Sequence, residues 1–314
     1  MGAIEICLVG LAVVIVSILL LRLHAFLGLI LGAFVVSALT PGVGTEAMAK
    51  VAEGFGIGCK KIGILIALAA IIGQCLLLSG AAQRIVQGLL SLFGVKKAPM
   101  AFLGSGFVLG IPVFFDTVFY LMLPLVRAFA RTNPRVYILA LLSVVAGASM
   151  AHSLVPPTPG PLLVAAGLEV SLGVLIPAGL LLGLLTISVG YVYARWANER
   201  FEIPLREVDL PEVEKEEERE LPGLGWSIFP ILLPLILISV GTFVKMQGEV
   251  PDWLAMLSDK NIAMALGAGA AMILASRYCE LKRVVNEALS SGGVIILITA
   301  AGAAFGAVLK GTGI

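Results

Sequence analysis

The sequence predicts an all-α polytopic membrane protein, and three observations support this fold class. Of the 314 residues, 59% are apolar and only 13% are charged, whereas soluble domains carry about 25% charged residues. The mean hydropathy is +1.06. Apolar stretches long enough to cross a bilayer, about 20 residues each, recur along the chain. We therefore expect helices that lie in lipid and satisfy their backbone hydrogen bonds internally.

Nine apolar stretches are candidate spans or paired half-spans. The N-terminus lacks the basic region and the small-residue cleavage site of a signal peptide, so the first stretch is expected to be a transmembrane helix. The nine stretches are Ile6 to Leu21, Ala25 to Thr40, Ile62 to Gly80, Ala98 to Val126, Val136 to Ala151, Val170 to Ala194, Leu224 to Val244, Ile262 to Ser276 and Ser291 to Leu309.

Two places in these stretches predict a break in the helix. The stretch from Ala98 to Val126 carries one charge, Asp116, and is too long for one straight span. We expect it to break at Gly110-Ile-Pro112, because proline removes a backbone donor and clashes with the preceding turn. The second break is marked by four prolines within six residues, Pro156, Pro157, Pro159 and Pro161. Non-helical backbone at membrane depth must be covered by protein or line a watered cavity, so this segment is either a surface loop or a re-entrant tip.

One strongly charged segment is expected to lie outside the bilayer. Residues 195–220 contain five basic side chains among ten acidic ones, as in a solvated linker. Because the positive-inside rule counts lysine and arginine rather than net charge, this segment is expected on the cytoplasmic side.

The chain also contains an internal repeat. A shift of 233 residues (306 − 73) places Gly73–Gly80 on Gly306–Gly313, so that Ser79-Gly80 aligns with Thr312-Gly313. Internal repeats in opposite orientation are the usual build of secondary transporters. We therefore expect a first transmembrane repeat in residues 1–194, a charged cytoplasmic linker in 195–223 and the start of a second repeat in 224–314.

The same shift aligns two charged amphipathic stretches, each just before a glycine-rich span. Each stretch has a charge pair four residues apart, Glu46 with Lys50 and Arg283 with Glu287. Such a pair suits a helix that lies in the membrane interface. A solvated loop fits each stretch equally well.

Composition and motifs exclude several classes of function. The 21 basic and 20 acidic residues leave a net charge of +1, so no nucleic-acid partner is expected. Two histidines and four scattered cysteines form no metal-ligand or disulfide pattern, and no cofactor is predicted. The chain has no phosphate-binding loop for a primary pump and no nucleophile or zinc motif for an intramembrane enzyme. Secondary transport remains, with a non-transporting membrane assembly protein as the alternative from a different class.

Two long segments are similar to signature segments of the gluconate permease (Gnt) family of proton symporters. They are Gly110-Ile-Pro-Val-Phe-Phe-Asp116-Thr-Val-Phe-Tyr120 and His152-Ser-Leu-Val-Pro-Pro-Thr-Pro-Gly-Pro161, and the resemblance extends over the whole chain. It implies proton-coupled uptake of gluconate or a related small hydroxy acid across a bacterial or archaeal inner membrane. The partners implied are a small carboxylate substrate, a proton and the lipid bilayer.

The resemblance also implies a fold. Members of the wider ion-transporter superfamily have two inverted repeats, each with a re-entrant hairpin, and commonly work as homodimers. Because this chain stops at Ile314, where the second hairpin turns, we expect its second repeat to be incomplete. Idonate, fructuronate, glycerate and D-serine are alternative substrates, and sodium is an alternative coupling ion.

Asp116 is the candidate site for the coupled proton. A carboxylate at the bilayer centre costs roughly 2.5–3.5 kcal/mol on insertion scales, which suggests a role. Alternatively, Asp116 caps the helix that begins after Gly110-Ile-Pro112. The neighbouring Thr117 is a candidate substrate-binding residue.

The proline-rich segment offers three more candidates. His152 is expected to relay the proton or to donate to an oxygen of the sugar acid, and a packed histidine is the alternative. Ser153 and Thr158 have hydroxyls that suit substrate hydroxyls. Equally, these two hydroxyls would satisfy the broken backbone beside them.

Two repeat-related turns are candidate sites for the substrate carboxylate. At Ser79-Gly80 and Thr312-Gly313 a hairpin tip would expose backbone N–H groups at the N-termini of half-helices. Contacts between small residues of packed helices are the alternative. Arg84 follows the first turn and would clamp a carboxylate in two places, although an arginine at the membrane boundary is also common.

Overall fold

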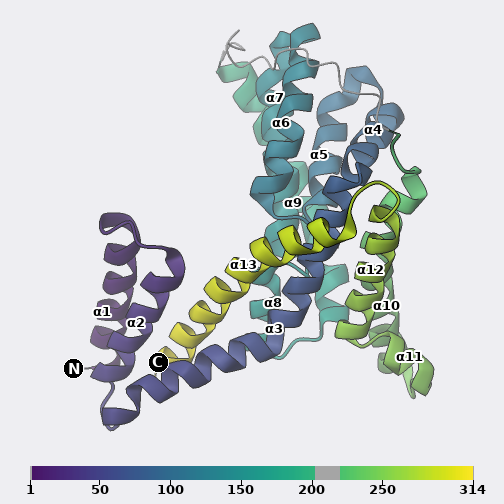
Figure 1. Ribbon diagram of the computed structural model, residues 1–314. Helices are drawn as coiled ribbons and strands as arrows, with labels where there is room; N and C mark the ends of the chain where they lie inside the picture. The colour runs from purple at the N-terminus through teal and green to yellow at the C-terminus, as the bar shows by residue number, and fades with distance from the viewer. Residues whose placement is uncertain (1, 202–219, 314) are drawn as a thin grey trace. The chain divides into compact units, whose positions relative to one another are not determined.

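The computed structural model describes residues 2–201 and 220–313, and these residues form helices and connecting turns with no strand (Figure 1). The predicted all-α membrane fold class is thereby confirmed. Most of the predicted charged linker, including Arg206, Lys215 and Arg219, lies outside the described residues. The helices are α1 (Ala3–Ile15), α2 (Ala25–Leu39), α3 (Ala47–Leu78), α4 (Ala81–Phe93), α5 (Ala98–Leu109), α6 (Phe115–Thr132), α7 (Tyr137–Leu154), α8 (Pro159–Leu168), α9 (Leu172–Arg200), α10 (Leu224–Gln247), α11 (Asp252–Leu257), α12 (Lys260–Ala275) and α13 (Leu281–Lys310).

Six helical segments among the described residues are long and apolar enough to cross a membrane. They are Ala3–Leu20, Gly44–Leu78, Pro134–Leu168, Leu172–Arg200, Leu224–Gln247 and Leu281–Lys310. Three shorter apolar helices, α2, α5 and α12, occupy three of the other predicted stretches. The chain is therefore a multi-pass membrane protein.

Both predicted breaks are present. The first divides α5, which ends at Leu109, from α6, which begins at Phe115. The second divides α7 from α8, where Thr158 is the N-cap and Pro159 the first helical residue. Proline is tolerated at that first position because its missing N–H has no partner in the first turn of a helix.

The two amphipathic stretches of the repeat are helical and continuous with the spans that follow them, so the solvated-loop alternative is wrong. Helix α3 runs without interruption for 32 residues and α13 for 30 residues. In α3 the residues Val51, Gly54, Gly58, Ile62 and Leu65 are all buried at helical spacing. The lysines and glutamate of the same stretch are exposed, so its charges lie on the outer face of a continuous helix.

The described chain forms two compact units. Unit 1 comprises Met1–Ala67 with Ser290–Ile314, and unit 2 comprises Leu68–Leu289. The core of unit 1 combines residues from α1, α2, α3 and α13, namely Ile6, Ala33, Val36, Val51, Ala304, Phe305 and Val308.

Glycines let α3 and α13 approach closely in unit 1. A β-carbon on Gly54 would lie 3.0 Å from Ala304 Cα, and one on Gly58 would lie 2.9 Å from Ala303 Cβ. Further along, a β-carbon on Gly63 would lie 3.8 Å from Ile296 Cγ2. As the residue numbers along α3 rise, the residue numbers of the contacted positions in α13 fall, so the two helices pack antiparallel.

In unit 2, glycines let α5 and α7 pack closely. A β-carbon on Gly106 of α5 would lie 2.8 Å from the Val144 carbonyl oxygen, and one on Gly110, the C-cap of α5, would lie 2.9 Å from the Ala148 carbonyl oxygen. Gly106 and Gly110 are four residues apart, the small-residue spacing of close helix contacts in membranes. This packing fixes the α5–α6 break beside α7.

Aromatic side chains cluster where the charged segment begins and ends. Trp196 contacts Tyr193 and Phe201 at the end of α9, and Trp226 contacts Phe229 at the start of α10. Both tryptophans are more than half exposed. Such residues collect at the membrane–water interface, so we expect one interface at this end of α9 and α10.

Candidate functional site

The α5–α6 break lies directly against the last turns of α3. A β-carbon on Gly73 would be 2.8 Å from the Pro112 carbonyl oxygen, so only glycine permits this approach. The break therefore sits beside the segment of α3 that leads to Ser79-Gly80.

Asp116 lies in the first turn of α6 and is exposed. Within the described part of the chain, no hydrogen bond reaches its carboxylate. The partial positive charge at the start of a helix favours a carboxylate in its first turn, so Asp116 stabilises α6 at this position. The N-cap residue of α6 is Phe114, not Asp116. Thr117 follows in the same turn and is half-buried.

His152 comes from the last turns of α7 and packs against Phe114 at the break, two residues before Asp116. The ring of Phe114 packs edge-on against the imidazole, with 6.1 Å between centroids, and the negative charge of Asp116 acts on the imidazole. The Nδ1 atom of His152 is buried and has no hydrogen-bond partner among the described residues. The structure thus brings together the two residues predicted to handle the proton.

The other polar candidates of the proline-rich segment differ from each other. Ser153 is exposed. Thr158 is buried, and its Oγ1 donates to the Val155 carbonyl oxygen at 2.7 Å. The Thr158 hydroxyl therefore pairs with a backbone carbonyl of the broken segment. This is the structural role that was given above as the alternative to substrate binding.

Ser79-Gly80 forms the break between α3 and α4. Gly80 has φ +80°, a left-handed conformation that favours glycine. The Ser79 hydroxyl is fully buried, donates to the Leu76 carbonyl oxygen at 3.5 Å and accepts from the Ala81 N–H at 3.3 Å. Arg84 lies one turn further on, half-buried, and its backbone N–H donates to Gly80.

Thr312-Gly313, in unit 1, repeats this geometry at the end of α13. The Thr312 hydroxyl donates to the Leu309 carbonyl oxygen at 2.7 Å, three residues back as in Ser79. Gly313 has φ +88°. The first residues of α3 and α13 differ by 234 positions and the last by 232, close to the repeat shift.

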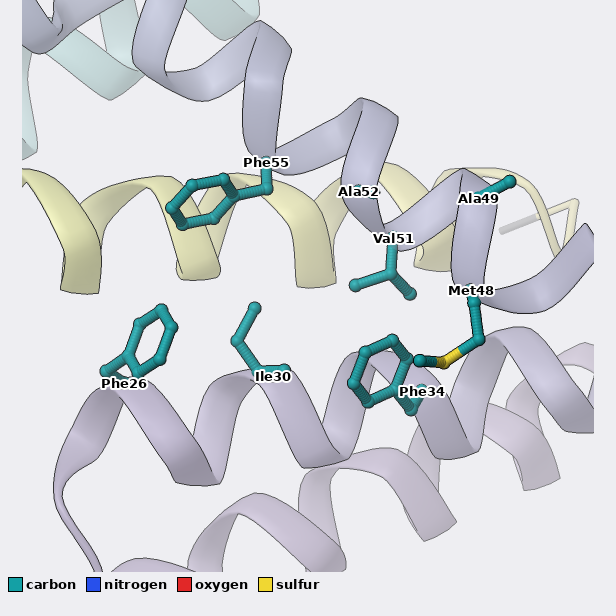
Figure 2. A pocket seen from close by; sticks show the side chains of 8 residues that line it. All are labelled: Phe26, Ile30, Phe34, Met48, Ala49, Val51, Ala52 and Phe55. Atoms are coloured by element: carbon teal, nitrogen blue, oxygen red, sulfur yellow. The ribbon is translucent and has the colours of Figure 1, made fainter.

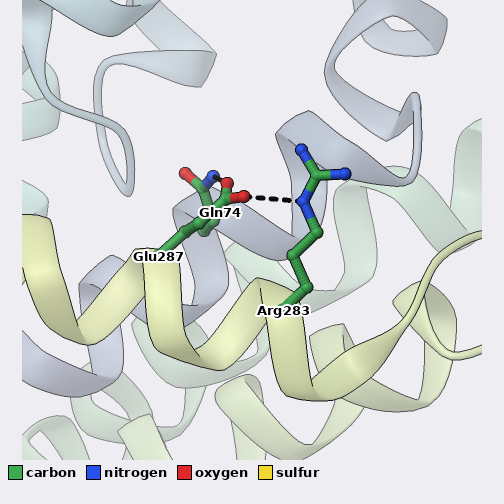
Figure 3. A network of polar contacts seen from close by, with 3 residues as sticks. All are labelled: Gln74, Arg283 and Glu287. Carbon is green, nitrogen blue, oxygen red and sulfur yellow. Dashed lines mark hydrogen bonds and ion pairs between the residues drawn. The ribbon is translucent and has the colours of Figure 1, made fainter.

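A polar network that the sequence reading missed joins α3 to α13 in unit 2 (Figure 3). Gln74 Nε2 donates to Glu287 Oε2 at 2.7 Å, and Arg283 Nε donates to Glu287 Oε1 at 2.8 Å. The Arg283–Glu287 charge pair was predicted and is confirmed. In the described chain its counterpart, Glu46 with Lys50, is not formed. The sequence contains one signal for this network: Gln74 is an isolated amide in the otherwise apolar stretch between Lys61 and Ser79, which also has one cysteine.

Two grooves lie away from these residues. Figure 2 shows the groove of unit 1, about 530 Å³, between α2 and α3. Its lining is apolar throughout: Phe26, Ile30, Phe34, Met48, Ala49, Val51, Ala52 and Phe55. The other groove, about 450 Å³, lies between α9 and α10. The first offers no side-chain donor for a carboxylate, and neither contains a predicted site residue.

Comparison with known proteins is consistent with this arrangement. The model of the GntP family permeases matches residues 3–314. The chain is 30% identical to an uncharacterized permease of Haemophilus influenzae, covering 98% of this chain and 67% of that protein. It is 27% identical to a gluconate permease of Zymomonas mobilis (98% and 71%) and 25% identical to the Gnt-II system L-idonate transporter of Escherichia coli (97% and 71%).

Proposed function

The chain belongs to the GntP family of permeases, and on that premise we propose that it takes up gluconate or a related small sugar acid together with protons. As a permease it is a multi-pass inner-membrane transporter and not an enzyme. The relatives named for gluconate and L-idonate support a sugar acid as the substrate.

The observation that carries the proposal of proton coupling is the placement of Asp116 and His152 near the same helix break, where the His152 ring packs against Phe114. A carboxylate and an imidazole within electrostatic reach can exchange or share a proton as the substrate arrives. In this mechanism Asp116 holds the coupled proton, and the unpartnered Nδ1 of His152 is a hydrogen-bonding atom for the substrate or the proton. Backbone groups freed at the break and at Ser79-Gly80 bind polar groups of the substrate.

We also propose that the chain is built from two inverted repeats, residues 1–194 and from 224 onward, joined by a cytoplasmic linker. The packing of α3 and α13 supports this. Gly54 packs against Ala307, and Glu287 bonds to Gln74. Adding 233 to 54 gives 287, and subtracting 233 from 307 gives 74. Each contact is therefore the repeat image of the other, as a two-fold relation requires. A homodimer is proposed as the working unit.

Uptake into proteoliposomes tests the proposed function. With an alkaline interior and no ATP, the purified protein should accumulate labelled gluconate, and a protonophore should abolish the accumulation. Unlabelled idonate and glycerate, added as competitors, rank the substrates. Protein-free liposomes are the control. If no sugar acid accumulates above that control under a pH gradient, the proposal is wrong.

A further inference from the structure

We propose that Arg283 binds the carboxylate group of the transported sugar acid, with its guanidinium held in place by Glu287 and Gln74. This inference rests on the proposed function and adds a binding residue to it. Arg283 lies outside the Asp116 and His152 site and outside both glycine turns.

The network holds only one edge of the guanidinium. Arg283 uses Nε to reach Glu287 Oε1, and the second oxygen of Glu287 is bonded to Gln74. In Figure 3 the dashed line to Glu287 starts at Nε, and no dashed line starts at either terminal nitrogen of Arg283. These nitrogens have no partner in the described chain, and the side chain is 70% exposed. Two parallel N–H donors of this kind match a carboxylate, which they bind in a bidentate manner.

Helix stability does not account for this arrangement. Arginine precedes glutamate in the pair, and this order stabilises a helix less than the reverse order. Arg283 also lies in the first turn of α13, where the helix dipole disfavours a cation. Exposed pairs of this type contribute little. An anion bound to the free edge of Arg283 would offset the unfavourable position of its charge.

The local charge also favours an anion. Between residues 277 and 287 the basic side chains are Arg277, Lys282 and Arg283, and the acidic ones are Glu280 and Glu287. Three minus two leaves +1, and all three basic side chains are exposed. The positive charge attracts a monoanion despite the presence of Glu287.

Gln74 links this carboxylate site to the rest of the proposed pathway. Its amide oxygen is not used in the bond to Glu287 and can accept from a substrate hydroxyl. Gln74 is also five residues before Ser79, about 7.5 Å along a helix, and follows Gly73, which contacts the α5–α6 break. A sugar acid with its carboxylate on Arg283 therefore extends its hydroxyls toward α3.

The test compares gluconate uptake by three variants. Arg283→Gln should raise the KM for gluconate at least about tenfold, the size of a lost charge-assisted hydrogen bond, with a smaller change in maximal rate. Arg283→Lys should restore part of the loss, because lysine keeps the charge but not the bidentate geometry. Arg277→Gln removes the same charge from a nearby exposed position and should leave KM within about twofold, because its charge is one contributor to a screened local field.

Two results would overturn the inference. One is an unchanged KM in Arg283→Gln. The other is an increase in KM that occurs only in liposomes with anionic lipid and vanishes in phosphatidylcholine, which would make a lipid phosphate the partner of Arg283. The proposed function fails separately, namely when the unmodified protein accumulates no sugar acid.

Discussion

Gly63 of α3 and Ile296 of α13 face each other. Their residue numbers differ by 233 (296 − 63), which is the shift that aligns the two repeats. In an antiparallel helix pair, a position that meets its own repeat image lies on the two-fold axis. The axis proposed for the inverted repeats therefore passes between these two residues. Contacts on either side of it should be related in pairs, as Gly54–Ala307 and Gln74–Glu287 are.

The close approach of α3 and α13 gives a first prediction. Gly58→Leu should lower the free energy of unfolding by about 1–3 kcal/mol, because the side chain would enter the backbone of α13. Gly56→Leu is the matched control, since a β-carbon there meets nothing within 4 Å. Thermal unfolding in detergent measures both. Equal midpoints for the two variants would contradict the described helix contact.

A second prediction concerns Asn198, whose amide joins α9 to the start of α7. Its Oδ1 accepts from the Leu139 N–H at 2.9 Å, and its Nδ2 donates to the Arg135 carbonyl oxygen at 2.9 Å. Asn198→Ala should cost about 1–3 kcal/mol, because it leaves a partly buried backbone donor unpaired. Asn286→Ala, at an exposed position of α13, should have little effect. The idea fails if both variants unfold at the midpoint of the unmodified protein.

A third prediction separates coupling from binding at Asp116. Asp116→Asn should reduce pH-driven accumulation of gluconate to the level of protein-free liposomes, because the amide cannot carry the proton. Exchange of labelled for unlabelled gluconate should persist, since exchange needs no change of protonation. Asp252→Asn, also exposed in the first turn of a helix, is the control. Normal accumulation by Asp116→Asn would remove this residue from the coupling site.

A fourth prediction follows from charge arithmetic. A monoanion carried with one proton moves no net charge, so the membrane potential, worth about 2.3 kcal/mol per charge per 100 mV, does no work on the cycle. One pH unit supplies about 1.4 kcal/mol, or about tenfold accumulation. A pH gradient at zero voltage should drive uptake, and a potassium-diffusion potential alone should not. Strong uptake driven by voltage alone would require a second proton or a sodium ion.

The sequence predicts the helix breaks because their causes are local. Pro112 and the cluster Pro156–Pro161 remove backbone donors and clash with the preceding turn, and helix breaks occur at both places, whereas the single prolines Pro124 and Pro177 lie inside helices. The six long apolar segments follow equally directly from composition. The start of α3 was missed for a physical reason, since hydropathy places the span at Ile62, whereas helical hydrogen bonds continue through exposed lysines and a glutamate back to Ala47.

Candidate site residues could be proposed from the sequence, but their contacts could not. Asp116 and His152 stand out as polar groups in apolar runs, yet their proximity depends on the packing of α5 on α7. The bond between Gln74 and Glu287 joins residues 213 positions apart, and no local pattern pairs them. Conversely, Ser79, Thr158 and Thr312 have hydroxyls that the local turns already use.

The tryptophans at Trp196 and Trp226 have a practical consequence for protein engineering. Each belongs to its own aromatic cluster, one at the end of α9 and one at the start of α10, and such residues favour the membrane interface. The segment between these clusters is therefore the place to insert a fluorescent reporter or an affinity tag. An insertion there lengthens a connection at a small entropic cost.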